Sequence, residues 1–130
     1  IRYFNYLMLR RGDEIWIEQR MEKDIWRQLY QFHLQESLNE KRPEEVLVDF
    51  LEGQHSQENE LSLKQVHSLK PHKLSHQTIH ICVLEAVAKN GFKLPATAQG
   101  QWVGIKELDG FAFPRPLRNF LDRNQLTLPL

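Results

Sequence analysis

The stretch TIHICVLEAVA, Thr78–Ala88, constrains the fold of this chain more than any other segment. Alternate side chains of an extended segment point to opposite faces, which places Ile79, Ile81 and Val83 together on one face. The other face carries Thr78, His80, Cys82 and Leu84. Because apolar residues occur on both faces, the pattern predicts a well-buried strand. Such a strand belongs inside a sheet that other layers cover.

Shorter runs predict further strands on either side of one helix. Residues 3–9 and 14–19 alternate around Arg11-Gly12-Asp13, and the glycine can adopt the positive φ of a tight hairpin turn. Residues 29–34 and 61–69 predict two more strands, and residues 102–103 predict a short strand before a helical turn at 105–108. Residues 21–27, residues 54–60 and the segment opened by Gly91 and Pro95 are expected to form loops.

Two helices are expected. Pro43 followed by Glu44 and Glu45 predicts a helix start, since proline fits the first turn and acids oppose the dipole there. One face of this helix carries Val46, Leu47, Phe50 and Leu51, and Gly53 is a natural stop. A closing helix over 116–124 would bury Leu117, Phe120 and Leu121. Strands first, a helix in the middle and a helix at the end favour an α/β fold of the α+β layer type.

Composition limits the other possibilities. The 130 residues suit a single domain over 1–130, and 17 basic against 17 acidic side chains leave no global charge. The single cysteine, Cys82, excludes an intrachain disulfide framework and favours a reducing compartment. No apolar stretch of about 18 residues and no leader pattern occur, so no membrane partner is expected. A start at Ile1, without methionine, suggests a piece of a longer protein.

The region before the long strand is basic and rich in histidine. Three lysines occur between Lys64 and Lys73, histidines interleave from His67 to His80, and no acid lies between residues 60 and 85. A charge run is usually a solvated face. The alternative is a small phosphate-tracking loop in which the lysines position a nucleic-acid backbone while Ser75 or His76 probes a base. The residues alone leave both interpretations open.

The sequence gives little support for a metal site or for nucleophilic catalysis. On an extended segment His76 and His80 lie about 13 Å apart, too far to meet one ion at about 2 Å, and His72 could meet His76 only across a bend. Ser75 and His76 are adjacent, so they point apart, and no Gly-x-Ser-x-Gly elbow is present. We therefore expect no metal ligand and no catalytic residue in this domain.

Three segments resemble one known family. They are RYFNYLMLRRGDEIWIEQRMEKDIWRQLYQFHLQE, HKLSHQTIHICVLEA and ELDGFAFPRPLRNFL, and together they span nearly the whole chain. They resemble the C-terminal domain of MutY-type adenine DNA glycosylases. The resemblance implies a Nudix-like fold, a mixed β-sheet sandwiched by helices, that recognises 8-oxoguanine in DNA. It also implies that adenine excision belongs to an N-terminal domain with an iron–sulfur cluster, which this chain lacks.

The resemblance assigns the lesion contact to a Phe-Ser-His loop, whose place Leu74-Ser75-His76 takes here. Ser75 would hydrogen-bond the part of 8-oxoguanine that differs from guanine, where N7 gains a hydrogen. His76 would support the loop, and Leu74, which replaces the aromatic residue, could insert between base steps. The expected DNA-binding set is Lys70, His72, Lys73, Leu74, Ser75, His76 and Gln77.

The expected partners are double-stranded DNA with 8-oxoguanine opposite adenine and the N-terminal domain of the same enzyme. The domain itself is expected to be a monomer without cofactor, in a bacterial cytoplasm near the nucleoid. Two alternatives stay open: a Nudix-type nucleotide pyrophosphohydrolase and a protein-interaction module. The helix from Pro43 to Glu52 argues against the hydrolase, because it lacks the Arg-Glu-x-x-Glu-Glu cluster that holds metal ions against a diphosphate.

Overall fold

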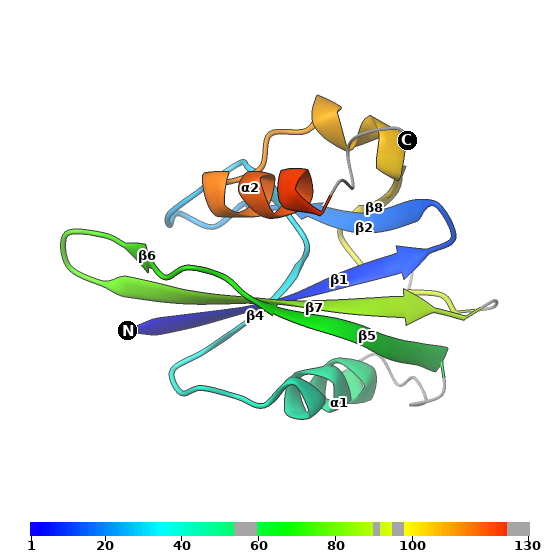
Figure 1. Cartoon of the computed structure of the whole chain (residues 1–130), viewed down its shortest axis with the longest axis horizontal. Helices are drawn as coiled ribbons and strands as arrows, with labels where there is room; N and C mark the ends of the chain where they lie inside the picture. The colour runs from blue at the N-terminus through cyan, green and yellow to red at the C-terminus, as the bar shows by residue number, and fades with distance from the viewer. Residues whose placement is uncertain (54–59, 90–91, 95–97, 125–130) are drawn as a thin grey trace.

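The protein is described by a computed structural model that covers residues 1–53, 60–89, 92–94 and 98–124. Its centre is a mixed sheet with the path β3-β2-β1-β7-β5, from which β4, β6 and β8 branch. Helix α1 covers one face of this sheet and α2 covers the other (Figure 1). This arrangement confirms the α+β class and the sheet sandwiched by helices.

The described elements follow one another in this order: β1 (Arg2–Arg11), β2 (Glu14–Gln19), β3 (Tyr30–Gln31), β4 (His33–Ser37), α1 (Pro43–Gly53), β5 (Leu61–Ser68), β6 (His72–Lys73), β7 (Thr78–Ala88), β8 (Gln101–Gly104), the 3-10 helix η2 (Ile105–Gly110) and α2 (Arg115–Arg123).

Strand β7 lies inside the sheet between β1 and β5, as its sequence predicts. It runs parallel to β1 and antiparallel to β5. One face of β7 joins the core under α2, and the other joins the core above α1. The first set is Ile79, Ile81 and Val83, and the second is Leu84, Ala86 and Ala88. The two-faced apolar pattern therefore reflects two cores, one on each side of the sheet.

The predicted hairpin is confirmed, whereas the third strand is only partly right. Gly12 turns the β1–β2 hairpin with a φ of 59°. The run predicted as one strand over 29–34 forms two strands on different partners, since β3 pairs with β2 and β4 pairs with β1. The reason is that β2 pairs with β1 only from Arg10 onward, which leaves the start of β1 open to β4. The chain changes partner at Phe32, which is fully buried.

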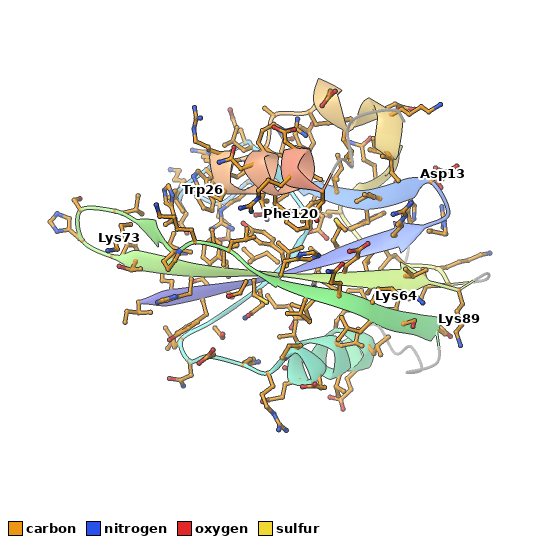
Figure 2. All side chains as sticks on the ribbon, in the orientation of Figure 1. Asp13, Trp26, Lys64, Lys73, Lys89 and Phe120 are labelled. Carbon is orange, nitrogen blue, oxygen red and sulfur yellow. The ribbon has the colours of Figure 1, made fainter. Side chains whose placement is uncertain are left out.

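Both helices lie where the sequence predicts them and bury the expected faces. In α1 the buried residues are Val46, Phe50 and Leu51, and Leu47 packs partly against the same core. In α2 they are Leu117, Phe120 and Leu121. Figure 2 shows Phe120 on the side of α2 that faces the sheet. The short strand near Trp102 and the helical turn after it are also confirmed as β8 and η2.

The remaining expectations concern the predicted loops and a membrane span. Residues 54–59 of one predicted loop, and Gly91 and Pro95 of another, lie outside the described residues. The loop predicted over 21–27 is confirmed as irregular backbone. Within the described ranges, no helix has the length and apolar character needed to cross a membrane.

Candidate nucleic-acid interface

The predicted lesion loop is the tip of the β6–β7 hairpin. His72 pairs with Ile79 and Lys73 with Thr78. The Leu74 N–H then donates to the Gln77 carbonyl oxygen at 2.8 Å, which closes the turn. The two residues between them, Ser75 and His76, are exposed. In Figure 1 this hairpin reaches out at the end of the sheet where the N-terminus lies. The chain therefore presents a hydroxyl and an imidazole on a short, hydrogen-bonded turn.

Leu74 has a different environment from its two neighbours. It is half-buried and packs against the core that lies under α2. The Leu74 side chain thus points inward and holds the tip to the body of the domain. Gln77, at the other side of the turn, is also half-buried.

The base of the hairpin rests on an aromatic residue of the loop after β2. The His72 ring lies 5.2 Å from the Trp26 ring, and Trp26 makes an edge contact with Phe4 at 5.9 Å. Trp26 has a φ of 63°, a left-handed conformation that a non-glycine residue adopts only when its surroundings hold it there. The sequence alone did not reveal that Trp26 lies between the sheet and the base of the hairpin.

An ion-pair network holds the Trp26 loop in place. Asp24 accepts hydrogen bonds from Arg2 at 2.6 Å and from Arg20 at 2.7 Å, and the Arg20 side chain is almost fully buried. The hydrogen bond from Arg2 is the largest cause that holds the pKa of Asp24 well below its usual range. Arg2 also binds Glu36 on β4, and these two acids raise the pKa of Arg2. The loop is thereby tied to β1 and β4.

A basic groove of about 760 Å³ lies beside the hairpin. One wall is the β5–β6 connection with β6, and the other wall is α2. The lining residues are Leu69, Lys70, Pro71, His72 and Lys73 on the first wall and Arg115, Pro116, Asn119 and Arg123 on the second. None of these lining residues is acidic. The groove therefore combines four positive charges and a histidine over one concave surface.

The structure thus brings together part of the predicted set and adds to it. Lys70, His72 and Lys73 line the groove, and Ser75 and His76 stand at the adjoining tip.

The wall contributed by α2 was missed by the sequence reasoning. Its residues, Arg115, Asn119 and Arg123, are spaced four apart, so they share one helical face opposite to the buried one. That spacing was a visible signal of an exposed polar face. The spacing alone does not indicate that this face lies across the groove from Lys70 and Lys73.

The acids of α1 do not form a metal site of the kind that a diphosphate hydrolase needs. Glu45, Asp49 and Glu52 have the spacing of one helical face, but Asp49 pairs with Lys41 at 2.9 Å and Glu45 lies 3.6 Å from Arg42. Among the described residues, no group of three histidine, cysteine, aspartate or glutamate side chains could hold a metal ion. The donor set therefore does not fit the magnesium ions of Nudix chemistry, and the expected lack of a metal in this domain stays a prediction.

Comparison with solved structures shows the same fold. A C. elegans Ap4A hydrolase in a binary complex matches with a TM-score of 0.70 and 12% identity over 98% of both chains. The MutT protein from Methanosarcina mazei Go1 matches with a TM-score of 0.67 and 15% identity, over 95% of this chain and 91% of that one. The Nudix hydrolase RenU from M. smegmatis matches at 0.66 and 13%, over 98% and 88%. At these identities the likeness concerns the fold.

The sequence comparisons identify the family. No curated protein matches the sequence of this chain. A family model described as NUDIX domain matches residues 5–123, which is nearly the whole length and includes both helices and the hairpin tip. The chain therefore belongs to the NUDIX domain family.

Proposed function

We propose that this NUDIX domain recognises 8-oxoguanine opposite adenine in double-stranded DNA, as the C-terminal domain of a MutY-type adenine glycosylase. In this role the domain performs no chemistry, and adenine excision belongs to an N-terminal domain outside this chain. The observation that carries the proposal is the exposed Ser75-His76 tip beside a groove lined only by basic and neutral residues.

The chemistry of the tip suits the lesion. Oxidation converts guanine N7 from an acceptor to an N–H donor and adds an oxygen at C8. The Ser75 hydroxyl can accept a hydrogen bond from the new N7–H, where guanine offers only an acceptor. His76 can donate to an oxygen of the same nucleotide when its ring nitrogen carries a proton. With guanine the same hydroxyl could only donate to N7, so this hydrogen bond reverses direction between the two bases.

The geometry around the tip adds to this argument. A reader of base edges must be held in position, since loosely held groups lose discrimination. The closed turn at Leu74 and Gln77, the packing of Leu74 and the contact of His72 with Trp26 all hold the tip. The basic groove next to it provides the phosphate contacts that set register without reading sequence.

A titration of backbone amide signals tests the proposal. Duplexes with 8-oxoguanine or guanine opposite adenine are added to the 15N-labelled protein at about 50 mM salt, where phosphate contacts are strong. We expect both duplexes to shift the groove signals and only the lesion duplex to shift Ser75 and His76 strongly. Equal shifts at the tip for both duplexes would overturn the proposal. The double variant Ser75→Ala with His76→Ala should remove the difference between the two duplexes.

A second candidate function is hydrolysis of a nucleoside diphosphate linkage. The family and the solved structures titled as Nudix and Ap4A hydrolases favour it. The donor set opposes it, because no group of three histidine, cysteine, aspartate or glutamate side chains among the described residues could hold a metal ion. We therefore place this function second.

One assay separates the two functions. The protein is incubated with 8-oxo-dGTP or Ap4A and Mg²⁺ or Mn²⁺, and released phosphate products are measured. Lesion recognition predicts no turnover above a buffer control. Metal-dependent turnover that Asp49→Asn or Glu52→Gln abolishes would establish the hydrolase instead, while Glu14→Gln on β2 is the matched control for a lost acid far from α1.

A further inference from the structure

We infer that the α2 wall of the groove, Arg115, Asn119 and Arg123, binds the phosphate backbone of duplex DNA together with Lys70 and Lys73. This inference rests on the proposed function and deepens it, since it names the surface that holds the duplex while the tip reads the base. It concerns residues that neither the fold nor the lesion chemistry requires.

The charges of this wall have no structural partner among the described residues. Arg115, Asn119 and Arg123 are exposed and form no ion pair or side-chain hydrogen bond within the described part of the chain. Arg118 of the same helix behaves differently, as it lies 3.6 Å from Asp109 and stacks on Phe113. The helix thus neutralises the arginine outside the groove lining and leaves the groove arginines available.

Arg115 also violates a local rule of helix stability. It is the first residue of α2, where the dipole is positive, and the first turn contains no acid. A cation at this position is unfavourable for the helix, whereas an anion is favourable. A local conflict of this kind is expected where function rather than stability determines the residue. A phosphate bound between Arg115 and the helix start would resolve it.

The dimensions of the wall fit one strand of a duplex. Arg115 and Arg123 are eight residues apart, which corresponds to about 12 Å along the helix axis. A single DNA strand carries one phosphate per about 3.4 Å of duplex axis, so this length spans three to four phosphates. Asn119, midway between the two arginines, can donate its amide N–H to a phosphate oxygen. The lysines of the opposite wall lie across the same groove.

The salt dependence of binding tests the inference. Affinity for a duplex is measured by fluorescence anisotropy from 50 mM to 300 mM salt for the unaltered protein and for Arg115→Gln with Arg123→Gln. Each lost phosphate contact should lower the magnitude of the log–log salt slope by about 0.9, so the double variant should lose about 1.8. If the two proteins converge near 1 M salt, this slope difference gives about 60-fold weaker binding at 0.1 M.

A matched control is available on the same sheet. Lys64 and Lys89 are exposed and lie at the far end of the sheet from Lys73 (Figure 2). The variant Lys64→Gln with Lys89→Gln removes the same charge, so it should retain the slope within about 0.3, well under one phosphate contact. An equal loss in this control would show that net charge alone matters and would overturn the inference.

The experiment also separates this inference from the proposed function. The α2 variant should weaken binding to lesion and guanine duplexes by the same factor, and the tip variant should remove discrimination while keeping the salt slope. An unchanged slope in the α2 variant would refute the groove as a backbone site and leave lesion reading intact. Normal groove behaviour with no discrimination in the unaltered protein would refute lesion reading alone.

Discussion

The half-buried position of Leu74 leads to a sharp prediction about how the tip of the β6–β7 hairpin is held. The resemblance to MutY-type domains leaves room for this residue to enter the duplex, but the structure packs it against the core under α2. A leucine side chain that is exposed to solvent until DNA binds contributes little to the stability of the free protein. A residue that anchors the hairpin contributes measurably, and Leu74→Ala distinguishes the two roles.

The expected magnitude follows from burial. Replacing a fully buried leucine by alanine costs about 2–5 kcal/mol. Because Leu74 is half-buried, we expect a loss of about half as much, ~1–2 kcal/mol in the free energy of unfolding. Leu38 provides the control, since its side chain is 81% exposed and Leu38→Ala should change stability by less than about 0.5 kcal/mol.

Two assays measure the effect. Denaturant unfolding gives the global change, and amide hydrogen exchange gives the local one at residue 74, whose N–H is bonded to the Gln77 carbonyl oxygen. A cost of 1–2 kcal/mol corresponds to about 5- to 30-fold faster exchange. The variant Leu74→Met keeps the side-chain volume and should restore most of the protection and the base discrimination. A stability loss for Leu74→Ala no larger than that of Leu38→Ala would refute the anchor.

Three further predictions concern the framework that supports the interface. Gly100→Ala should destabilise the protein by about 1–3 kcal/mol, because its Cβ would lie 2.6 Å from a backbone carbonyl oxygen and from a buried indole. A Cβ at Gly53 would meet no atom within 4 Å, so Gly53→Ala should lack that cost. Urea unfolding of both variants measures the difference. Phe120→Ala removes a ring that is 1% exposed and should cost about 3–5 kcal/mol; a loss under about 1 kcal/mol would show that α2 does not depend on it. The hydrogen bond from Arg2 holds the pKa of Asp24 below the ordinary aspartate pKa of about 3.9. This stabilisation is therefore present above about pH 4 and declines as pH falls through the folded pKa. Asp24→Asn should therefore lower stability at pH 7 and flatten the acid limb of a stability–pH curve, and parallel acid limbs for the two proteins would contradict the role of the ion pair.

Much of the fold follows from local patterns. The alternation in β7, the spacing of Val46, Phe50 and Leu51 in α1, and the glycine turn at Gly12 each predict an element that the structure contains. These predictions succeed because side-chain period and turn chemistry are properties of neighbouring residues. The division of residues 29–34 between two partners could not be predicted in this way, since it depends on how far β2 stays beside β1.

Some features of the candidate site are likewise specified by local sequence, and others depend on tertiary contacts. The sequence by itself determines that Ser75 and His76 stand in a basic stretch free of acids and just before a strong strand. Only the tertiary structure decides that Leu74 faces the core, that Trp26 supports His72, and that α2 lies across the groove from the lysines. The physical reason is that burial and charge complementarity arise from contacts between segments far apart in the chain, whose closure no local pattern specifies.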